Sequence, residues 1–265
     1  MNTSTQCLKK RLSEREILLG TGLSLGSLRA AELVGRTRFD YAMVDTMHGH
    51  YDKAGATDSI RSLLCAGGPT PIARVSENSA GQINDMLDAG ALGIVVPMIE
   101  SRGEAEAAVE ACFYPPVGRR SKGSIAPVMH GADYAARANS IISLIAMIET
   151  PDAAEHADDI LGVPEVTACL IGASDLEFVL GTGRDSADFL SAVDHVVAAG
   201  LSHGVAVGIS ITSADETEPW IDRGISFFLA SHDLAILGSA IRRYDESFTV
   251  VRAGAGDGSR VRSRS

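Results

Sequence analysis

The sequence is short of positive charge, of paired cysteines and of long apolar runs. Its 23 Lys and Arg residues face 34 Asp and Glu residues, which gives a formal net charge of −11. A surface of this charge repels nucleic acid and anionic membranes, so neither partner is expected. An acidic ligand would need a local cation, which must be an arginine, a lysine or a metal ion. No run approaches the roughly 18 apolar residues of a membrane span, and the polar N-terminus has no signal-peptide pattern.

The four cysteines form no CxxC pair and have no spacing typical of a metal site. Cys65, Cys112 and Cys169 stand in apolar segments, which predicts that they are small residues of the core. A reducing compartment is therefore expected, and the protein is predicted to be cytoplasmic.

What the sequence does contain is a repeated alternation of short apolar runs and amphipathic helical stretches. Eight runs are predicted as strands: 18–23, 41–44, 70–75, 93–96, 144–148, 168–171, 205–209 and 227–230. Helical patterns between them include 80–89, 103–113, 153–161, 188–203 and 214–223. Several strands are apolar on both faces, as in a parallel sheet that is covered by helices. The 265 residues suit a single-domain (β/α)8 TIM barrel, which needs roughly 250.

The barrel domain is predicted to cover residues 1–251. Residues 252–265 are rich in Gly, Ser and Arg without periodicity, and they are predicted to be disordered. Residues 114–139 form the one stretch predicted as irregular, and a loop of that length is usually functional or part of an interface. No Gly-rich phosphate loop follows the seventh or eighth strand, which argues against a phosphate-using barrel.

Polar residues that follow the strands are the candidate site, because the chemistry of such barrels lies at strand ends. Asp45 and His48 follow the second strand. An acid three residues before a histidine can orient its imidazole, although a pair of surface loop residues would look the same. Arg74 ends the third strand, where it would clamp a carboxylate or enolate oxygen or form a salt bridge to a neighbouring helix.

Two carboxylates, Glu149 and Asp175, follow the fifth and sixth strands. They would repel each other unless a cation lay between them, and such an oxygen pair suits Mg²⁺ or Mn²⁺. The alternative is that both residues cap helices. Gly172, Ala173 and Ser174 precede Asp175 and leave backbone N–H groups at a helix start, where a substrate carboxylate can bind.

One further residue and one triplet are less specific indications of a site. Asp88 lies at the end of a predicted helix, and taken alone it is a surface residue. Ser231, His232 and Asp233 follow the last strand, where they either contact a ligand or cap the final helix. Capping is the favoured interpretation of this triplet.

In their joint order these residues resemble the HpcH/HpaI aldolase family, the metal-dependent class II pyruvate aldolases. The resemblance runs from around Leu8 to Tyr244. Four blocks carry it: FDYAMVDTMHGHYD, PIARVSENSAGQINDMLDAGALGIVVPMIES, YPPVGRRSKG, and LIAMIETPDAAEH with LIGASDLEFVLG. It implies a (β/α)8 barrel and a homo-oligomer, commonly a hexamer built from dimers that exchange a terminal helix.

The resemblance also implies a ligand set. Glu149 and Asp175 would hold a divalent metal ion, with Mg²⁺ expected first and Mn²⁺ or Co²⁺ as alternatives. The backbone of Gly172 and Ala173, with the adjoining Ser174, would hold the carboxylate of a 2-keto acid.

Roles in the reaction follow in the same way. Arg74 would stabilise the enolate oxygen, and His48 would act as general base or organise a catalytic water molecule. Asp45 and Asp88 would be the acidic partners near that histidine. The predicted function is therefore a metal-dependent carbon–carbon lyase that acts on 2-keto acids through a pyruvate-type enolate.

The sequence departs from the family pattern at three places. Met47 stands where an acidic residue usually precedes the histidine, and His50 is unusual. Residues 123–139 also differ, and they are expected to lie where the electrophile approaches. These departures admit a member that decarboxylates or condenses oxaloacetate, like macrophomate synthase or the citrate synthases of siderophore biosynthesis.

A hypothesis of another class is a non-catalytic binding subunit that keeps the fold. Retention of His48, Arg74, Glu149 and Asp175 argues against it.

Overall fold

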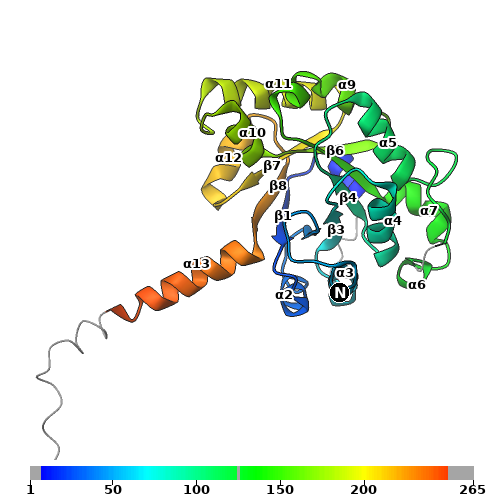
Figure 1. The fold of residues 1–265 in the computed structure, drawn as a ribbon, viewed down its shortest axis with the longest axis horizontal. Coiled ribbons are helices and arrows are strands. Elements are labelled where there is room, and N and C mark those ends of the chain that lie inside the picture. The colour runs from blue at the N-terminus through cyan, green and yellow to red at the C-terminus, as the bar shows by residue number, and fades with distance from the viewer. Residues whose placement is uncertain (1–6, 124–125, 250–265) are drawn as a thin grey trace, which may run out of the picture.

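A closed barrel of parallel strands forms the centre of the molecule in the computed structural model, which describes residues 7–123 and 126–249 (Figure 1). Each strand pairs with the next along the chain, and β8 pairs with β1. The strands are β1 (Leu18–Leu23), β2 (Tyr41–Asp45), β3 (Thr70–Arg74), β4 (Gly93–Val96), β5 (Ser143–Ile148), β6 (Val166–Ile171), β7 (Ala206–Ile211) and β8 (Phe227–His232). The predicted (β/α)8 barrel is confirmed, and each predicted strand agrees with an observed one to within two residues at either end.

Helices connect the strands and surround the barrel. They are α1 (Leu8–Ser13), α2 (Leu28–Val34), α3 (Lys53–Ala66), α4 (Ala80–Ala89), α5 (Arg102–Cys112), α6 (Ala126–His130), α7 (Tyr134–Ile141), α8 (Pro151–Glu155), α9 (Ala157–Leu161), α10 (Ala173–Leu180), α11 (Ala187–His203), the 3-10 turn η1 (Ala214–Glu216), α12 (Thr217–Asp222) and α13 (Asp233–Glu246). The predicted helix 153–161 is interrupted at His156, which ends α8 and begins α9.

The stretch 114–139, predicted as irregular, contains α6 and most of α7, so that prediction is wrong. Within α7, Tyr134 and Ala138 are four residues apart and fully buried. The side chain of Arg120 has no exposed surface; its Nη1 donates to the Tyr134 hydroxyl at 3.0 Å, and its guanidinium lies 4.7 Å from the centroid of the Tyr114 ring. Contacts distant in sequence, rather than a strong local pattern, therefore order this segment.

Large side chains fill the interior of the barrel where glycines leave room for them. A Cβ atom at Gly20 would lie 2.2 Å from the Tyr41 ring, and one at Gly208 would lie 1.9 Å from the Phe227 ring. The two rings meet with their centroids 5.2 Å apart. Leu8 and Leu12 of α1 are buried in the same cluster, so α1 closes the amino-terminal end of the barrel.

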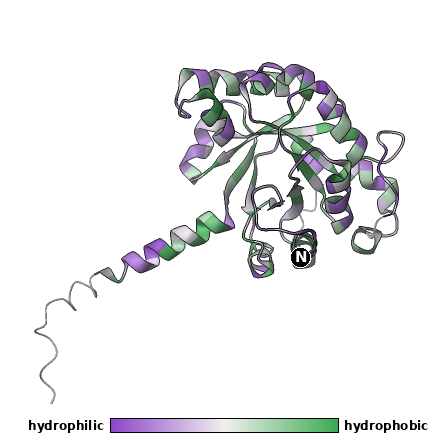
Figure 2. Cartoon of the chain, viewed as in Figure 1, coloured by the Kyte–Doolittle hydropathy of each residue, from purple (hydrophilic) through white to green (hydrophobic). Residues whose placement is uncertain are grey.

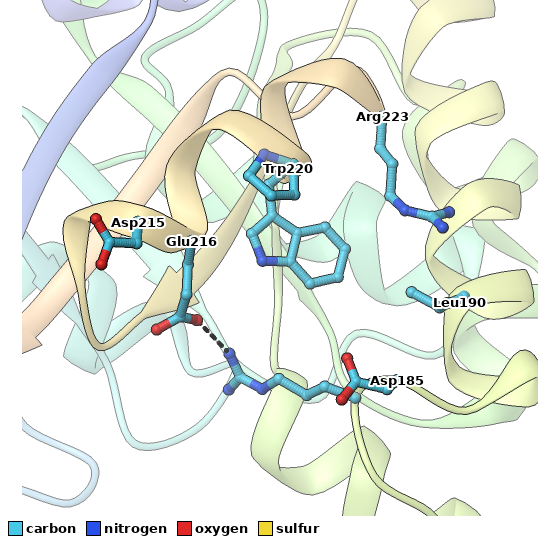
Figure 3. A pocket seen from close by; sticks show the side chains of 8 residues that line it. Asp185, Leu190, Asp215, Glu216, Trp220 and Arg223 are labelled. Carbon is cyan, nitrogen blue, oxygen red and sulfur yellow. Dashed lines mark ion pairs between the residues drawn. The ribbon is translucent and has the colours of Figure 1, made fainter.

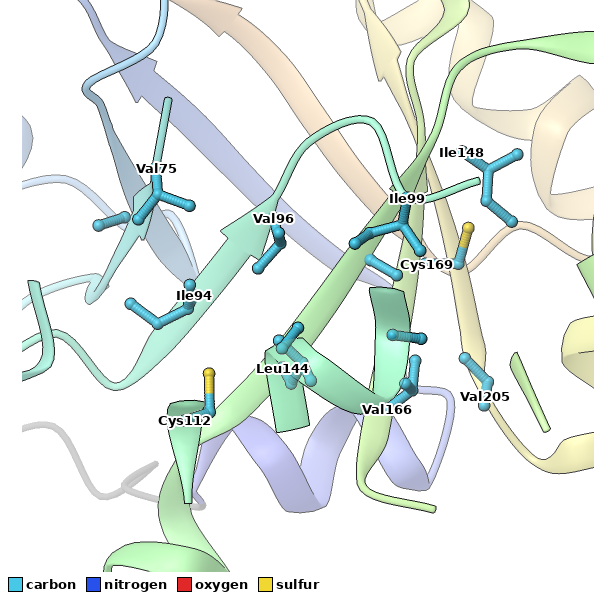
Figure 4. Packing of buried hydrophobic residues seen from close by; sticks show 14 of the residues in the cluster. Val75, Ile94, Val96, Ile99, Cys112, Leu144, Ile148, Val166, Cys169 and Val205 are labelled. Carbon is cyan, nitrogen blue, oxygen red and sulfur yellow. The ribbon is translucent and has the colours of Figure 1, made fainter. Parts of the chain in front are cut away.

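A second apolar layer lies between the strands and the surrounding helices, and Figure 4 shows part of it. Cys112 and Cys169 are buried there, as predicted, and burial raises the pKa of the Cys112 thiol to about 12. The core prediction is wrong for Cys65, which is exposed in the last turn of α3. It lies on the outer side of that helix, where it lines a hollow with Leu64 and Met129.

The last helix, α13, projects away from the barrel and carries apolar residues along much of its length (Figures 1 and 2). Only Asp233, at its first position, is buried. None of the helices described is long and apolar enough to cross a membrane. The tail predicted to be disordered, 252–265, lies outside the described residues.

Candidate active site

Asp45 and Arg74 end two neighbouring strands and face each other in the barrel register. Arg74 Nε donates to Asp45 Oδ1 at 2.9 Å, and Nη2 donates to Oδ2 at 2.7 Å. Both side chains are largely buried. Burial alone would raise the pKa of Asp45, but the hydrogen bonds and charge of Arg74 outweigh it and hold that pKa below its ordinary value. Arg74 thus pairs with the carboxylate of Asp45 on the neighbouring strand β2 and not with a residue of a helix.

His48 is positioned by Asp45 through the backbone. Asp45 Oδ1 accepts the N–H groups of Met47 and His48 at 3.1 and 3.2 Å, which folds the chain into a tight turn after β2. The predicted link between Asp45 and His48 is therefore present, but it runs to the His48 N–H and not to the ring. The exposed imidazole lines a cavity at the carboxyl end of the barrel.

This cavity has a volume of about 240 Å³. Its lining comes from the ends of β1, β2, β3 and β8 and from the start of α13: Gly22, Leu23, Ser24, Met43, Asp45, His48, Arg74, Leu229, His232 and Leu234. Three of these, Asp45, His48 and Arg74, were predicted as site residues from the strand-end rule. His232 was expected to contact a ligand or to cap the final helix, and its side chain does cap α13. Ser24 was missed, although it follows the first predicted strand directly and the same rule would have found it.

Glu149 and Asp175 lie beside the arginine, at the ends of β5 and β6. Glu149 is 1% exposed, and its Oε1 accepts the Met98 N–H at 2.8 Å. Burial raises the pKa of Glu149 and the charge of Asp175 adds to this, whereas the Met98 N–H and the charge of Arg74 act in the opposite direction. Two carboxylates held this close favour a shared proton or a shared cation.

The capping alternative fails for Glu149. Thr150 is the N-cap of α8, and its hydroxyl accepts the Ala153 N–H at 3.1 Å. Asp175 does lie in the first turn of α10, but the N-cap there is Gly172. Among the described residues, no cluster of three or more His, Cys, Asp or Glu side chains is arranged to hold a metal. Glu149 and Asp175 are therefore the candidate side-chain ligands for an ion at this place.

Because Gly172 has no side chain, the backbone there can lie directly against the side chain of Glu149. A Cβ atom at this position would lie 2.5 Å from Glu149 Oε2, so any larger residue would displace the carboxylate. The Gly172 N–H is used by the Ile148 carbonyl at 2.9 Å. Ala173 and Ser174 follow as the first residues of α10, where N–H groups precede the hydrogen bonds of the helix itself.

Asp88 does not join His48 within the chain, so the prediction that places the two together is not met. Asp88 lies near the end of α4, a few residues before β4 begins, and this puts it at the amino-terminal end of the barrel. There its Oδ1 accepts a hydrogen bond from Arg120 Nη2 at 3.0 Å.

The segment 123–139 precedes β5 and so also lies at the amino-terminal end, away from the cavity. The expectation that it stands where the electrophile approaches is wrong within this chain for the part that is described. His50, the other unusual residue, is exposed, and its N–H donates to the Ser24 carbonyl at 2.8 Å.

A separate pocket of about 440 Å³ lies between the loop after α10, helix α11 and helix α12 (Figure 3). Arg184, the cation at its centre, has partners within the chain. Its Nη1 donates to the Ser210 carbonyl at 2.8 Å, and its guanidinium forms ion pairs with Glu177 and Glu216. Trp220 packs at the back of the pocket with its ring near Phe189. These interactions join three surface segments.

The carboxyl end of the barrel thus gathers a largely buried arginine, a histidine and a pair of carboxylates. The chain is also similar to known proteins. Residues 23–238 match the family described as HpcH/HpaI aldolase/citrate lyase. The hydroxypyruvate/pyruvate aldolase of Paraburkholderia phytofirmans is 32% identical over 253 residues, which covers 92% of this chain and 97% of that protein.

Two solved structures are similar over their whole length. An HpcH/HpaI aldolase/citrate lyase family protein from Burkholderia cenocepacia has a TM-score of 0.85 at 29% identity, covering 91% of this chain and 98% of its own. The citrate synthase SbnG has a TM-score of 0.81 at 26% identity, covering 95% and 99%. The chain belongs to the HpcH/HpaI aldolase/citrate lyase family. It is an enzyme of the carbon–carbon lyase type.

Proposed function

We propose that the protein is a divalent-metal-dependent aldolase that makes or cleaves a carbon–carbon bond next to a 2-keto acid, through a pyruvate-type enolate. The observation that carries this proposal is the meeting of Glu149 and Asp175 beside Arg74 at one end of the barrel. The name of the 32% identical relative, hydroxypyruvate/pyruvate aldolase, supports the same substrate class.

The two carboxylates fit a divalent cation, with Mg²⁺ expected first and Mn²⁺ or Co²⁺ as alternatives. Glu149 is buried with a raised pKa in spite of the nearby charge of Arg74, so a further positive charge would favour the ionised pair. Its Oε1 is held by Met98, and Gly172 keeps space open beside Oε2. When bound, the ion would supply positive charge for the carboxylate and ketone oxygens of the substrate.

Arg74 supplies the second positive charge. Its Nε and Nη2 donate to Asp45, whereas among the described residues Nη1 has only the Met147 sulfur, at 4.0 Å. Nη1 is therefore free to donate to the ketone oxygen as that oxygen becomes an enolate, and Asp45 fixes the direction of the donor. A preorganised donor of this kind typically contributes roughly 3 kcal/mol at the transition state.

His48 handles the proton. In the cleavage direction its imidazole removes the proton of the aldol hydroxyl, directly or through a water molecule, as the carbon–carbon bond breaks. In the condensation direction it returns that proton to the new alkoxide. Asp45 aligns His48 through its backbone N–H and so links the base to the arginine. The N–H groups of Ala173 and Ser174 are proposed to bind the substrate carboxylate.

Deuterium exchange into the methyl group of pyruvate tests the proposal, with NMR detection and no aldehyde present. Metal-stripped protein should exchange slowly, and added Mg²⁺ or Mn²⁺ should restore exchange. The variants Glu149→Gln and Arg74→Lys should each lose most of it. Glu155→Gln, an exposed acid on α8, is the matched control and should exchange normally. Absence of exchange with every metal would contradict the proposal.

A second candidate function is the use of oxaloacetate as the enolate donor. The likeness to the citrate synthase SbnG, at 26% identity over nearly the whole chain, favours including it. Decarboxylation of oxaloacetate without exchange into pyruvate would move the assignment to this function.

We further propose that the protein is a homo-oligomer based on dimers in which α13 packs against a second copy. The exposed residues Leu234, Leu237, Ile241 and Tyr244 follow at spacings of three and four, so they form one stripe along the helix. Phe248, in the turn after the helix, is also exposed and contacts the Tyr244 ring. The main contacts of α13 within its own chain are with β1 and β8 at its first turn. A cytoplasmic location remains a prediction from the sequence.

A further inference from the structure

A second histidine, His232 at the end of β8, lines the same cavity as His48 and Arg74. Its Nδ1 accepts the Ala235 N–H at 3.4 Å as the N-cap of α13, and the Ser24 hydroxyl lies 3.2 Å from the same nitrogen. A backbone N–H can only donate, so in the tautomer that caps α13 the Nδ1 atom carries the lone pair and the ring proton is on Nε2. This Nε2–H has no partner among the described residues.

The backbone of β8 is shaped to present this side chain. The pairing of β1 with β8 shifts register between Gly20 and Gly22, which is a bulge that sets Gly22 opposite His232. Ser231 within the bulge has φ of +59°, a strained value for a residue with a side chain. A Cβ atom at Gly22 would lie 2.9 Å from His232 Cβ. Such a bulge redirects the side chain that follows it.

The buried carboxylate of Asp233 supports the His232 ring through Ser24. Asp233 is 8% exposed, and its Oδ1 accepts the Ser24 N–H at 2.7 Å and the Ser24 hydroxyl at 3.0 Å. Ser24 in turn lies against His232 Nδ1. Capping alone needs neither this support nor the bulge, because an N-cap serine or asparagine would satisfy the same N–H group.

Apart from His48, the proposed base, the polar side chains that remain uncommitted in this cavity offer donors. Asp45 is the only carboxylate among the described residues of the lining, and both its oxygens accept hydrogen bonds from Arg74. Arg74 Nη1 and His232 Nε2–H are unused by oxygen acceptors among the described residues. The other walls are mostly apolar: Leu23, Met43, Leu229 and Leu234. A small ligand with oxygen acceptors satisfies these donors, and a plain alkyl group does not.

We propose that His232 is a specificity-determining residue whose Nε2–H binds an oxygen atom on the aldehyde partner, so that the enzyme prefers short aldehydes bearing a hydroxyl or carboxylate over alkyl aldehydes. This inference rests on the proposed function, because it concerns the electrophile that meets the enolate. The proposal adds a contact between His232, at the end of β8, and the aldehyde to the groups on the other strands that are proposed to form the enolate.

The variant His232→Ser tests this inference. Serine retains an N-cap side chain for α13 and removes the Nε2–H donor. We would measure kcat and KM with pyruvate against glycolaldehyde, glyoxylate and acetaldehyde. The unaltered protein should prefer an oxygenated aldehyde, and the variant should raise KM for it about five- to tenfold while acetaldehyde changes little. A larger rise in KM for glycolaldehyde would identify a hydroxyl as the group that His232 binds, and a larger rise for glyoxylate would identify a carboxylate.

Ser186→Ala is the matched control, because Ser186 caps α11 away from the cavity by accepting the Phe189 N–H at 3.2 Å. It should leave the aldehyde preference unchanged. Equal losses on all three aldehydes in His232→Ser, or no preference in the unaltered protein, would overturn the inference. Failure of the proposed function gives a different result, since pyruvate exchange without aldehyde would then be absent from the unaltered protein.

Discussion

Asp45 and Arg74 are register partners at the ends of β2 and β3 and are joined by hydrogen bonds of 2.9 and 2.7 Å. The same aspartate accepts the N–H of His48, so one carboxylate fixes both the cation and the base of the proposed reaction. It need not touch the substrate to do so. Asp45 is therefore a positioning residue, and its loss should affect both stability and turnover.

Asp45→Asn should lower the free energy of unfolding by about 2–4 kcal/mol, because it leaves a largely buried guanidinium without its counter-charge. Urea unfolding at neutral pH measures this change. Glu110→Gln removes a partner of the exposed Arg119 pair and should cost less than about 0.5 kcal/mol. Similar effects of the two substitutions would contradict the stabilising role of the buried pair.

The stability difference between the unaltered protein and Asp45→Asn should depend on pH. The pKa of Asp45 is lowered in the folded state, so its contribution is fully present above the unfolded pKa of about 3.9. It should diminish as the pH falls below that value and through the lowered pKa. Urea unfolding of both proteins between pH 7 and pH 3 provides the measurement. A difference that stays constant over this range would show that the Asp45 carboxylate does not gain from its partners.

Mg²⁺ should raise the midpoint of thermal unfolding of the metal-stripped protein, because it binds the folded carboxylate pair. At a concentration of about 100 times Kd the gain is roughly 2.7 kcal/mol. Glu149→Gln should abolish the shift, whereas Glu155→Gln should preserve it. An equal shift in all three proteins would mean that the ion binds elsewhere.

The strand ends explain why most of the site could be predicted from the sequence. Carboxyl ends of parallel strands meet at one end of a barrel, so chain order alone gathers Asp45, Arg74, Glu149 and Asp175. The partner of each residue could not be predicted in this way. The Arg74–Asp45 pair depends on the register of two strands, which the apolar pattern does not specify.

The same rule shows why Asp88 lies apart from His48 within this chain. Asp88 stands before a strand and not after one, and residues in that position lie at the amino-terminal end of the barrel. Cys65 fails for another reason. Its apolar neighbours predict a core position, but it lies at the end of α3, on the outer side of that helix. Orientation about a helix axis is weakly determined within its last turn.

Gly208→Ala should destabilise the protein by about 1–3 kcal/mol, because the added methyl group would overlap the Phe227 ring inside a packed barrel. Gly183→Ala is the matched control: its Cβ would meet no atom within 4 Å and its φ is not positive. That substitution should be neutral or stabilise by up to about 1 kcal/mol. Thermal or urea unfolding of both variants tests this prediction. A Gly208→Ala protein as stable as the unaltered protein would contradict the close packing of β7 against β8.

The double variant Leu237→Glu with Ile241→Glu should dissociate the proposed oligomer, because it places two charges in the middle of the apolar stripe of α13. Light scattering after size-exclusion chromatography gives the mass of each species. Arg242→Glu changes charge on the same helix outside the stripe and should leave the oligomer intact. If the unaltered protein is monomeric, or if the double variant keeps the same mass, α13 is not the contact between copies. Far-UV circular dichroism of the double variant distinguishes loss of assembly from loss of the fold, since a dissociated barrel retains its helical signal.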